Sequence, residues 1–170
     1  MEEEIYRFLI LRICGAASAG AGAGIAYLSG YSIKESGHEK YENFRDAMET
    51  QGLPAVPDPI VDGEPPFVAD MDAGYHAMSQ LLGRTRDFTA VFAVNDLVAV
   101  GAMKALREQG LRVPEDVSVV GCDNIQFSSY MEPQLAAIRV PKAEMGRLAA
   151  GMNKETISAN GNNRHDNITR

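Results

Sequence analysis

The sequence has few of the residues on which metal and nucleophile chemistry depend. Only two cysteines and three histidines occur in 170 residues, and neither set has the close spacing of metal ligands. Cys14 and Cys122 lie far apart in the chain, and a reducing compartment is the simplest assumption for them. A phosphate-binding loop and a Gly-x-Ser-x-Gly motif are also absent. We therefore predict a protein that is not an enzyme and that needs no metal or cofactor.

Basic charge and long apolar runs are scarce as well. The chain carries 16 Lys and Arg against 23 Asp and Glu, a net charge of −7, which argues against a surface made for nucleic acid. No apolar run reaches the roughly 18 residues that indicate a membrane span. The hydrophobic content of 45% is ordinary for a packed globule, and the length suits about one domain.

The most informative stretch lies between residues 88 and 124. Ala90–Val94 and Val117–Gly121 are short, continuous apolar runs, which is the pattern of parallel strands covered on both faces by helices. Asn95 follows the first run and Asp123 follows the second closely. In an open parallel sheet the carboxyl ends of the strands are where small ligands bind. We therefore predict a ligand site that includes Asn95 and Asp123.

A helix is expected between these strands, over Leu97–Gln109. Asp96 is its predicted N-cap, and Gly110 has the place of the glycine that ends a helix. Its apolar residues cover more than the one stripe that docking on a sheet requires. Two interpretations stay open: a subunit interface, or a helix buried twice within one domain. The predicted interface residues are Leu97, Val98, Val100, Gly101, Met103 and, further along the chain, Tyr130.

Upstream segments extend the same alternation. A strand is expected at Ile25–Gly30, a helix at Glu39–Gln51, at best a short strand at Ile60–Val61, and a helix at Val68–Leu82. Strands that alternate with helices predict an α/β fold. The expected architecture is a doubly wound, mostly parallel sheet of about four strands, flanked by helices.

The two ends of the chain have a different composition. Residues 1–24 are expected to form a Gly/Ala-rich leader, with a signal peptide disfavoured by the acidic start. Gly20, Gly22 and Gly24 precede a strand instead of following one, so a dinucleotide loop is discounted. Residues 153–170 are polar and aperiodic, and are expected to be a disordered tail. The predicted folded domain is therefore 25–152.

The middle of the chain resembles a known family. Val-Asn-Asp at 94–96, Gly-Leu-Arg-Val-Pro-Glu-Asp-Val-Ser-Val-Val-Gly at 110–121 and Cys-Asp-Asn at 122–124 are similar to the effector-binding domain of LacI-type (lactose-repressor family) transcription regulators. The resemblance covers roughly 25–152. It implies one lobe of a periplasmic-binding-protein-like fold, whose two α/β lobes hold a sugar or purine between them. We expect the C-terminal lobe, with the helix-turn-helix and most of the first lobe missing.

The resemblance also implies roles for single residues. Asn95 and Asp123 are expected to contact the effector, although a turn or cap role for Asn95 is an open alternative. Lys40 stands where family members usually have an arginine, so a different effector or weaker binding is expected. Phe67 is the expected aromatic that stacks on the ligand, and Ser32 is a further candidate contact.

The implied partners and setting follow from the family. We expect a small, carbohydrate-like effector, a homodimer formed through the C-terminal lobe, a cytoplasmic protein, and at best weak effector binding with no DNA binding by this chain alone. Two alternatives stay open. In the first, the chain is a fragment of a transporter's periplasmic sugar-binding protein, a class of protein that shares the fold. In the second, it is a truncated product without function.

Overall fold

The computed structural model describes residues 24–29, 38–50, 52 and 68–151. The chain divides into one compact unit that ends at Arg139 and a second that begins at Val140. Within the second unit, residues 142–151 form a helix whose residues are all exposed. Predictions for Ser32, Phe67, the strand at Ile60–Val61, leader residues 1–23 and tail 153–170 lie outside the described residues.

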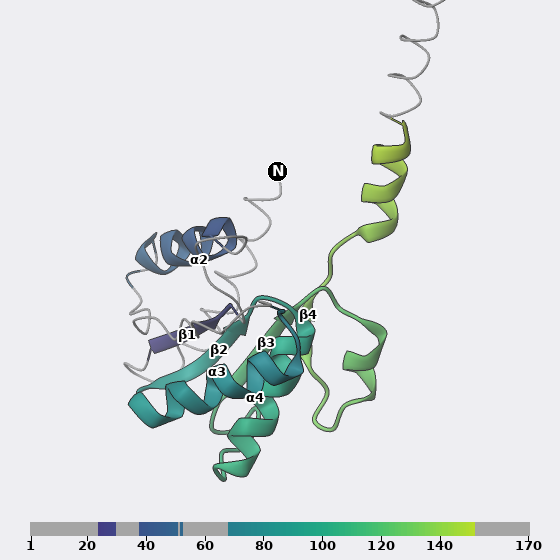
Figure 1. Ribbon diagram of the computed structural model, residues 1–170. Coiled ribbons are helices and arrows are strands. Elements are labelled where there is room, and N and C mark those ends of the chain that lie inside the picture. The colour runs from purple at the N-terminus through teal and green to yellow at the C-terminus, as the bar shows by residue number, and fades with distance from the viewer. Residues whose placement is uncertain (1–23, 30–37, 51, 53–67, 152–170) are drawn as a thin grey trace, which may run out of the picture. The chain divides into compact units, whose positions relative to one another are not determined.

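A four-stranded parallel sheet forms the centre of the first unit. Its strands are β1 (Gly24–Leu28), β2 (Phe88–Ala93), β3 (Ser118–Cys122) and β4 (Ala136–Ile138), and they lie side by side in chain order. Figure 1 shows helices on either side of this sheet. The predicted α/β architecture is therefore confirmed, and β4 is a strand that the sequence pattern did not predict.

Helix α2 (His38–Thr50) covers the sheet with an aromatic cluster. Phe44, which is 1% exposed, lies 5.2 Å from the ring of Tyr27 on β1 and 6.1 Å from that of Phe92 on β2. Tyr27 and Phe92 are partners in the β1–β2 register, so both rings project from the same face. Tyr41 meets Tyr27 edge-on at 5.6 Å. Aromatic rings at these separations attract one another beyond the area they bury, so the cluster anchors α2 to the sheet.

Helices α3 (Met71–Arg84) and α4 (Asp96–Glu108) cross at two glycines. A Cβ placed on Gly74 would lie 2.1 Å from the carbonyl oxygen of Val98, and one on Gly101 would lie 1.9 Å from that of Met71. Only glycine permits backbones to approach this closely. The second apolar side of α4 is therefore covered by α3, so the interpretation of a helix buried twice within one domain describes most of its excess apolar surface.

The ends of α4 confirm one sequence prediction and correct another. Gly110 has a φ of 74°, and the Leu111 and Gly110 amides donate to the carbonyls of Leu106 and Arg107, the pattern of a glycine-terminated helix. The predicted N-cap was wrong. Asn95 caps the helix, because its side-chain oxygen accepts from the Val98 amide at 2.8 Å, while Asp96 is the first helical residue and is 1% exposed.

Candidate functional site

Polar residues follow the first three strands at one edge of the sheet. Ser29 comes directly after β1, Asn95 follows β2 and Asp123 follows β3. Since the strands are parallel and adjacent, these three positions gather at the carboxyl edge, where ligands bind in open α/β sheets. Ser29 is 1% exposed, and sequence reasoning did not single it out. Its only signal was its place at the end of an apolar run.

Asn95 uses both ends of its amide within the fold. Its oxygen caps α4, and its Nδ2 donates to the carbonyl oxygen of Ala69 at 2.8 Å. The side chain thereby ties the start of α4 to the segment that leads into α3. The alternative role of Asn95, as a cap, is therefore the one that the structure shows, and an effector contact by this half-buried amide stays a prediction.

Asp123 stands in a conformation that L-residues rarely adopt. Its φ is 120° and that of Asn124 is 50°, so two successive residues other than glycine have positive φ. Such positions cost on the order of 1–3 kcal/mol each and cluster at functional sites. The Asp123 amide donates to the carbonyl oxygen of Ile138 on β4 at 2.9 Å, which holds the backbone at this point. The carboxylate is half-buried at the strand end, where it can accept hydrogen bonds from a ligand.

Lys40 is half-buried and lies in the first turn of α2. Because β1 precedes α2 in the chain, the helix starts from the same carboxyl edge as Asn95 and Asp123. An ammonium group at this edge suits a ligand hydroxyl or an anionic group, without the planar fork that arginine would offer. Ser32 and Phe67 are not among the described residues, and their contacts stay predictions.

The predicted interface residues do not share one surface. Val98 is fully buried in the core, and Gly101 is buried against α3, so neither offers surface to a second copy; this part of the prediction was wrong. The error arose because the apolar surface of a helix does not reveal which of its neighbours covers it. Leu97 and Val100 are half-buried, while Tyr130 is 76% exposed.

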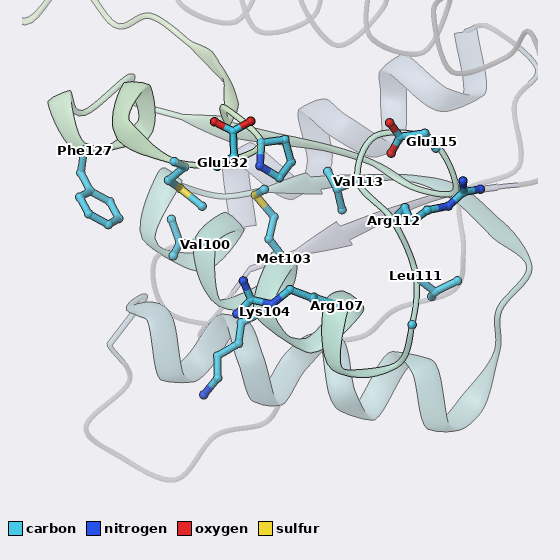
Figure 2. Close-up of a pocket in the computed structure, with 13 residues that line it drawn as sticks. Val100, Met103, Lys104, Arg107, Leu111, Arg112, Val113, Glu115, Phe127 and Glu132 are labelled. Carbon is cyan, nitrogen blue, oxygen red and sulfur yellow. The ribbon is translucent and has the colours of Figure 1, made fainter.

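A surface groove of about 600 Å³ lies elsewhere on the first unit. Figure 2 shows side chains from α4, from the loop after it and from the segment around Phe127 and Glu132 facing this groove. Val100 and Met103 contribute apolar surface from α4. None of Asn95, Asp123 and Lys40 lines the groove, so it is separate from the strand-end site. The charged residues that line it are Lys104, Arg107, Arg112, Glu115 and Glu132.

One ion pair has a clear effect on a pKa. Arg112 makes a bidentate contact with Asp116, in which Nε donates to one carboxylate oxygen at 2.8 Å and an Nη to the other at 2.6 Å. The Arg112 side chain and amide together lower the pKa of the Asp116 carboxyl to about 2. Asp116 precedes β3, so this pair belongs to the opposite edge of the sheet from Asp123 and takes no part in the candidate site.

The described part of the chain contains neither a candidate metal site nor a helix suited to span a membrane. Among residues 24–29, 38–50, 52 and 68–151, no three His, Cys, Asp or Glu residues gather closely enough to hold a metal ion. The helices found there also include none that is long and apolar enough to cross a membrane.

The fold and the strand-end site together define a class, the ligand-binding α/β domains of the periplasmic-binding-protein type. The periplasmic binding protein-like domain family matches residues 23–169, and the chain belongs to this family. Within it, the chain is an effector-binding domain of the LacI-type transcription regulators.

Named relatives are transcription regulators. The chain is 38% identical over 134 residues to the HTH-type transcriptional repressor PurR of Pasteurella multocida, a match that covers 79% of this chain and 39% of that protein. It is 39% identical over 125 residues to the HTH-type transcriptional regulator GalS of Salmonella typhimurium, covering 74% and 36%. The chain thus spans about two fifths of the length of the curated relatives it matches.

Solved structures agree with this placement. A sugar-binding transcriptional regulator of the LacI family from Escherichia coli, solved in complex with phosphate, matches with a TM-score of 0.70 and 30% identity. The match covers 84% of this chain and 49% of that structure's chain. The resemblance expected from residues 94–124 is therefore confirmed by sequence and by fold.

Proposed function

We propose that the chain binds a small, carbohydrate-like effector at the carboxyl edge of its sheet, and that Asp123 is the principal contact. The observation that carries this proposal is the turn at Asp123 and Asn124. A carboxylate held at a strand end by a backbone with positive φ is retained at a cost in stability, and such strain is typical of binding sites. A carboxylate accepts hydrogen bonds from adjacent hydroxyl groups, which suits a polyol.

Other residues complete the proposed site. Asn95 and Lys40 lie at the same edge and are proposed as further contacts, and Ser32 and Phe67 are proposed from the family pattern alone. The site performs no catalysis in this proposal, since its relatives are named as regulators and its polar groups serve recognition. The E. coli structure named as sugar-binding supports a carbohydrate-like effector.

The proposed setting is a cytoplasmic regulator. Relatives that are named transcriptional repressors and regulators support this setting over a transporter's binding protein or a product without function. In the complete regulator, effector binding would shift an equilibrium between states that differ in DNA affinity. The acidic balance of this chain supports the proposal that DNA is read by another part of the regulator.

Calorimetric titration tests the effector site. D-Ribose, D-galactose, D-fructose, hypoxanthine and guanine are titrated into the chain, and at least one of the sugars is expected to bind. Asp123→Asn is expected to weaken binding about 10- to 100-fold, because hydrogen bonds to a charged group contribute roughly 1.5–3 kcal/mol. Asp116→Asn is the matched control, since it removes the same charge at the other edge of the sheet and should leave affinity unchanged.

Three outcomes contradict the proposal. Absence of binding by every sugar up to millimolar concentration removes the carbohydrate class, and binding of a purine alone reassigns the effector. Equal losses in Asp123→Asn and Asp116→Asn mean that overall charge, and not the strand-end carboxylate, governs affinity.

We also propose that two copies pair through the groove described above. Its lining combines apolar side chains with charged side chains of both signs, so a twofold arrangement can place the basic residues of one copy against the acidic residues of the other. Phe127, 51% exposed, and Tyr130 add the aromatic surface that interface cores favour. Met103 and Val100 belong to this surface, and Leu97 is proposed as its edge.

Sedimentation equilibrium at tens of micromolar tests the pairing. Wild type is expected to be dimeric, and Phe127→Asp to be monomeric, because Phe127 lines the groove and a charge there would be buried at the proposed interface. Gln80→Asp introduces the same charge at an exposed position of α3 outside the groove and should leave the dimer intact. A monomeric wild type, or equal behaviour of the two variants, contradicts the proposal.

A further inference from the structure

Asp96 is a buried carboxylate that the proposed function does not use. It is 1% exposed, and within the described residues no basic side chain forms an ion pair with it. Its Oδ2 accepts two hydrogen bonds, from the Ile125 amide at 2.7 Å and from the Ser128 hydroxyl at 2.8 Å. Among the residues that the structure describes, its Oδ1 finds no hydrogen-bond partner. Burying a carboxylate without a basic partner costs free energy, which suggests that Asp96 has a structural or functional role that offsets this cost.

The fold around Asp96 is arranged to admit this group. Asp96 is the first residue of α4, and the positive end of the helix dipole offsets part of the cost of its charge. Gly121 on β3 leaves the necessary space, since a Cβ there would lie 2.4 Å from Oδ1 and 3.1 Å from the Asp96 Cα. The buried carboxylate, the glycine and the helix start therefore form one local arrangement.

The two donors that Asp96 holds lie directly beyond the strained turn. Ile125 follows Asn124, so the Asp96–Ile125 hydrogen bond fixes the far end of the turn at Asp123 and Asn124. The near end is fixed by the hydrogen bond from the Asp123 amide to Ile138 on β4. A backbone with positive φ persists only where its surroundings over-determine it. Asp96 supplies one of these two fixed points.

The same carboxylate also holds the short 3₁₀ helix η2 (Gln126–Tyr130). Ser128, 1% exposed, is bonded to Asp96 through its hydroxyl, and its carbonyl accepts from the Leu135 amide at 3.3 Å. On the outer side of η2, Phe127 and Tyr130 are exposed. One oxygen atom therefore joins the candidate effector turn to the segment that carries the proposed pairing surface.

We propose that Asp96 is a positioning residue that sets the Asp123 turn for effector contact and fixes η2 relative to it. The claim that the turn contacts an effector rests on the proposed function. The claim that Asp96 positions the turn rests on the geometry alone. Asp96 touches no ligand in this scheme. It acts through Asp123, whose carboxylate keeps a fixed direction at the strand end only while the Ile125 amide is hydrogen-bonded to Asp96.

Nuclear magnetic resonance of the full chain tests the positioning directly. The three-bond coupling between the amide and α protons of Asp123 is small at its φ of 120° and becomes large if the residue relaxes to an extended conformation. In Asp96→Ala the coupling is expected to rise. Amide exchange at Ile125 is expected to accelerate about 10- to 100-fold, the loss of a buried hydrogen bond to a charged group. Exchange at Val98, which Asn95 caps, is the internal reference.

Asp96→Asn is the matched control for this experiment. An asparagine of the same size can place its oxygen where Oδ2 stands and accept from both donors, so the coupling and the exchange at Ile125 are expected to stay near the wild-type values. If Asp96→Ala does not fold, Asp96→Ser replaces it, because serine suits a helix start but is too short to reach Ile125. Wild-type coupling and exchange in a folded Asp96→Ala or Asp96→Ser overturn the inference.

The effector titration gives a separate readout. Asp96→Ala is expected to lose affinity about as much as Asp123→Asn does, and Asp96→Asn to retain it. If wild type binds none of the probes, the proposed function fails while the coupling at Asp123 still decides the positioning role. If Asp96→Ala changes the conformation of the turn but binds as tightly as wild type, then Asp96 holds the turn without positioning it for the effector. That outcome overturns the effector part of the inference.

Discussion

The crossing of α3 and α4 gives a sharp test of the packing, through the substitution Gly101→Ala. The added Cβ would lie 1.9 Å from the carbonyl oxygen of Met71 and 2.6 Å from the amide nitrogen of Tyr75. Both obstacles are backbone atoms of a neighbouring helix, which no rotamer change can move. Reaching an ordinary contact requires the helices to separate by roughly 1.5 Å.

The free energy follows from two opposing effects. Overpacking of a core costs about 1–3 kcal/mol, and the upper end applies because the opposing atoms are backbone. Alanine recovers about 1 kcal/mol relative to glycine within a helix. We expect the free energy of unfolding to fall by about 2 kcal/mol. For a chain of this size, that lowers the melting temperature by roughly 4–8 °C.

Gly83→Ala is the matched control, in the same pair of helices. Beyond the helix's own nearby backbone, no atom of the described residues lies within 4 Å of a Cβ at Gly83 in α3, so only the helix-propensity gain applies there. Urea unfolding followed by circular dichroism should therefore show Gly83→Ala stabilised by up to about 1 kcal/mol and Gly101→Ala destabilised. Equal stabilisation of the two variants would refute the close approach of the helices.

The second crossing glycine extends the test. Gly74→Ala would meet the Val98 carbonyl oxygen at 2.1 Å and should destabilise the chain in the same direction. Since either substitution alone forces the same helix separation, the double variant should lose less than the sum of the two single losses. If the two losses in the free energy of unfolding add strictly, the two contacts relax independently of each other.

Three further outcomes follow from other parts of the structure. Phe44→Ala should lower the free energy of unfolding by about 3–5 kcal/mol in urea titrations, because it removes a buried ring from the aromatic cluster. Asn95→Ala should lower the free energy of unfolding by about 1 kcal/mol, measured in the same way, because the cap of α4 is lost. The Asp116 carboxyl should titrate near pH 2 by nuclear magnetic resonance, and closer to 3.9 in Arg112→Gln. Since the folded pKa is the lower one, the stability difference between wild type and Arg112→Gln should be present above about pH 4 and vanish as the pH falls toward 2.

Local signals were sufficient for the central β-α-β unit. The apolar runs before Asn95 and before Asp123 became β2 and β3, and the glycine at 110 ended α4 where the helix pattern stopped. These features depend on residues within one or two turns of each other, so a single sequence carries them. The three residues of β4 are too few to show a strand period, and pairing with β3 alone defines them.

The role of Asp96 had no local signal. An aspartate at a helix start is ordinarily an exposed cap, and its burial depends on Gly121 and on donors from Ile125 and Ser128, some 30 residues along the chain. The same limit applies to Gly101, whose neighbour on α3 decides that it lies inside the unit and not at an interface. Both errors concern which distant segment covers a residue, information that a short pattern does not hold.

The order of the strands bears on how the chain folds during synthesis. Because β1, β2, β3 and β4 lie side by side in the order in which they are made, each new strand finds its neighbour already present when it emerges. None of these four described strands must be inserted between two earlier ones, so this part of the sheet grows in one direction with the growing chain. The helices α3 and α4 come before the last two strands, so the apolar faces of β2 and β3 are covered soon after they form. Among the four described strands, the edge to which the next strand adds is therefore always that of the strand made last.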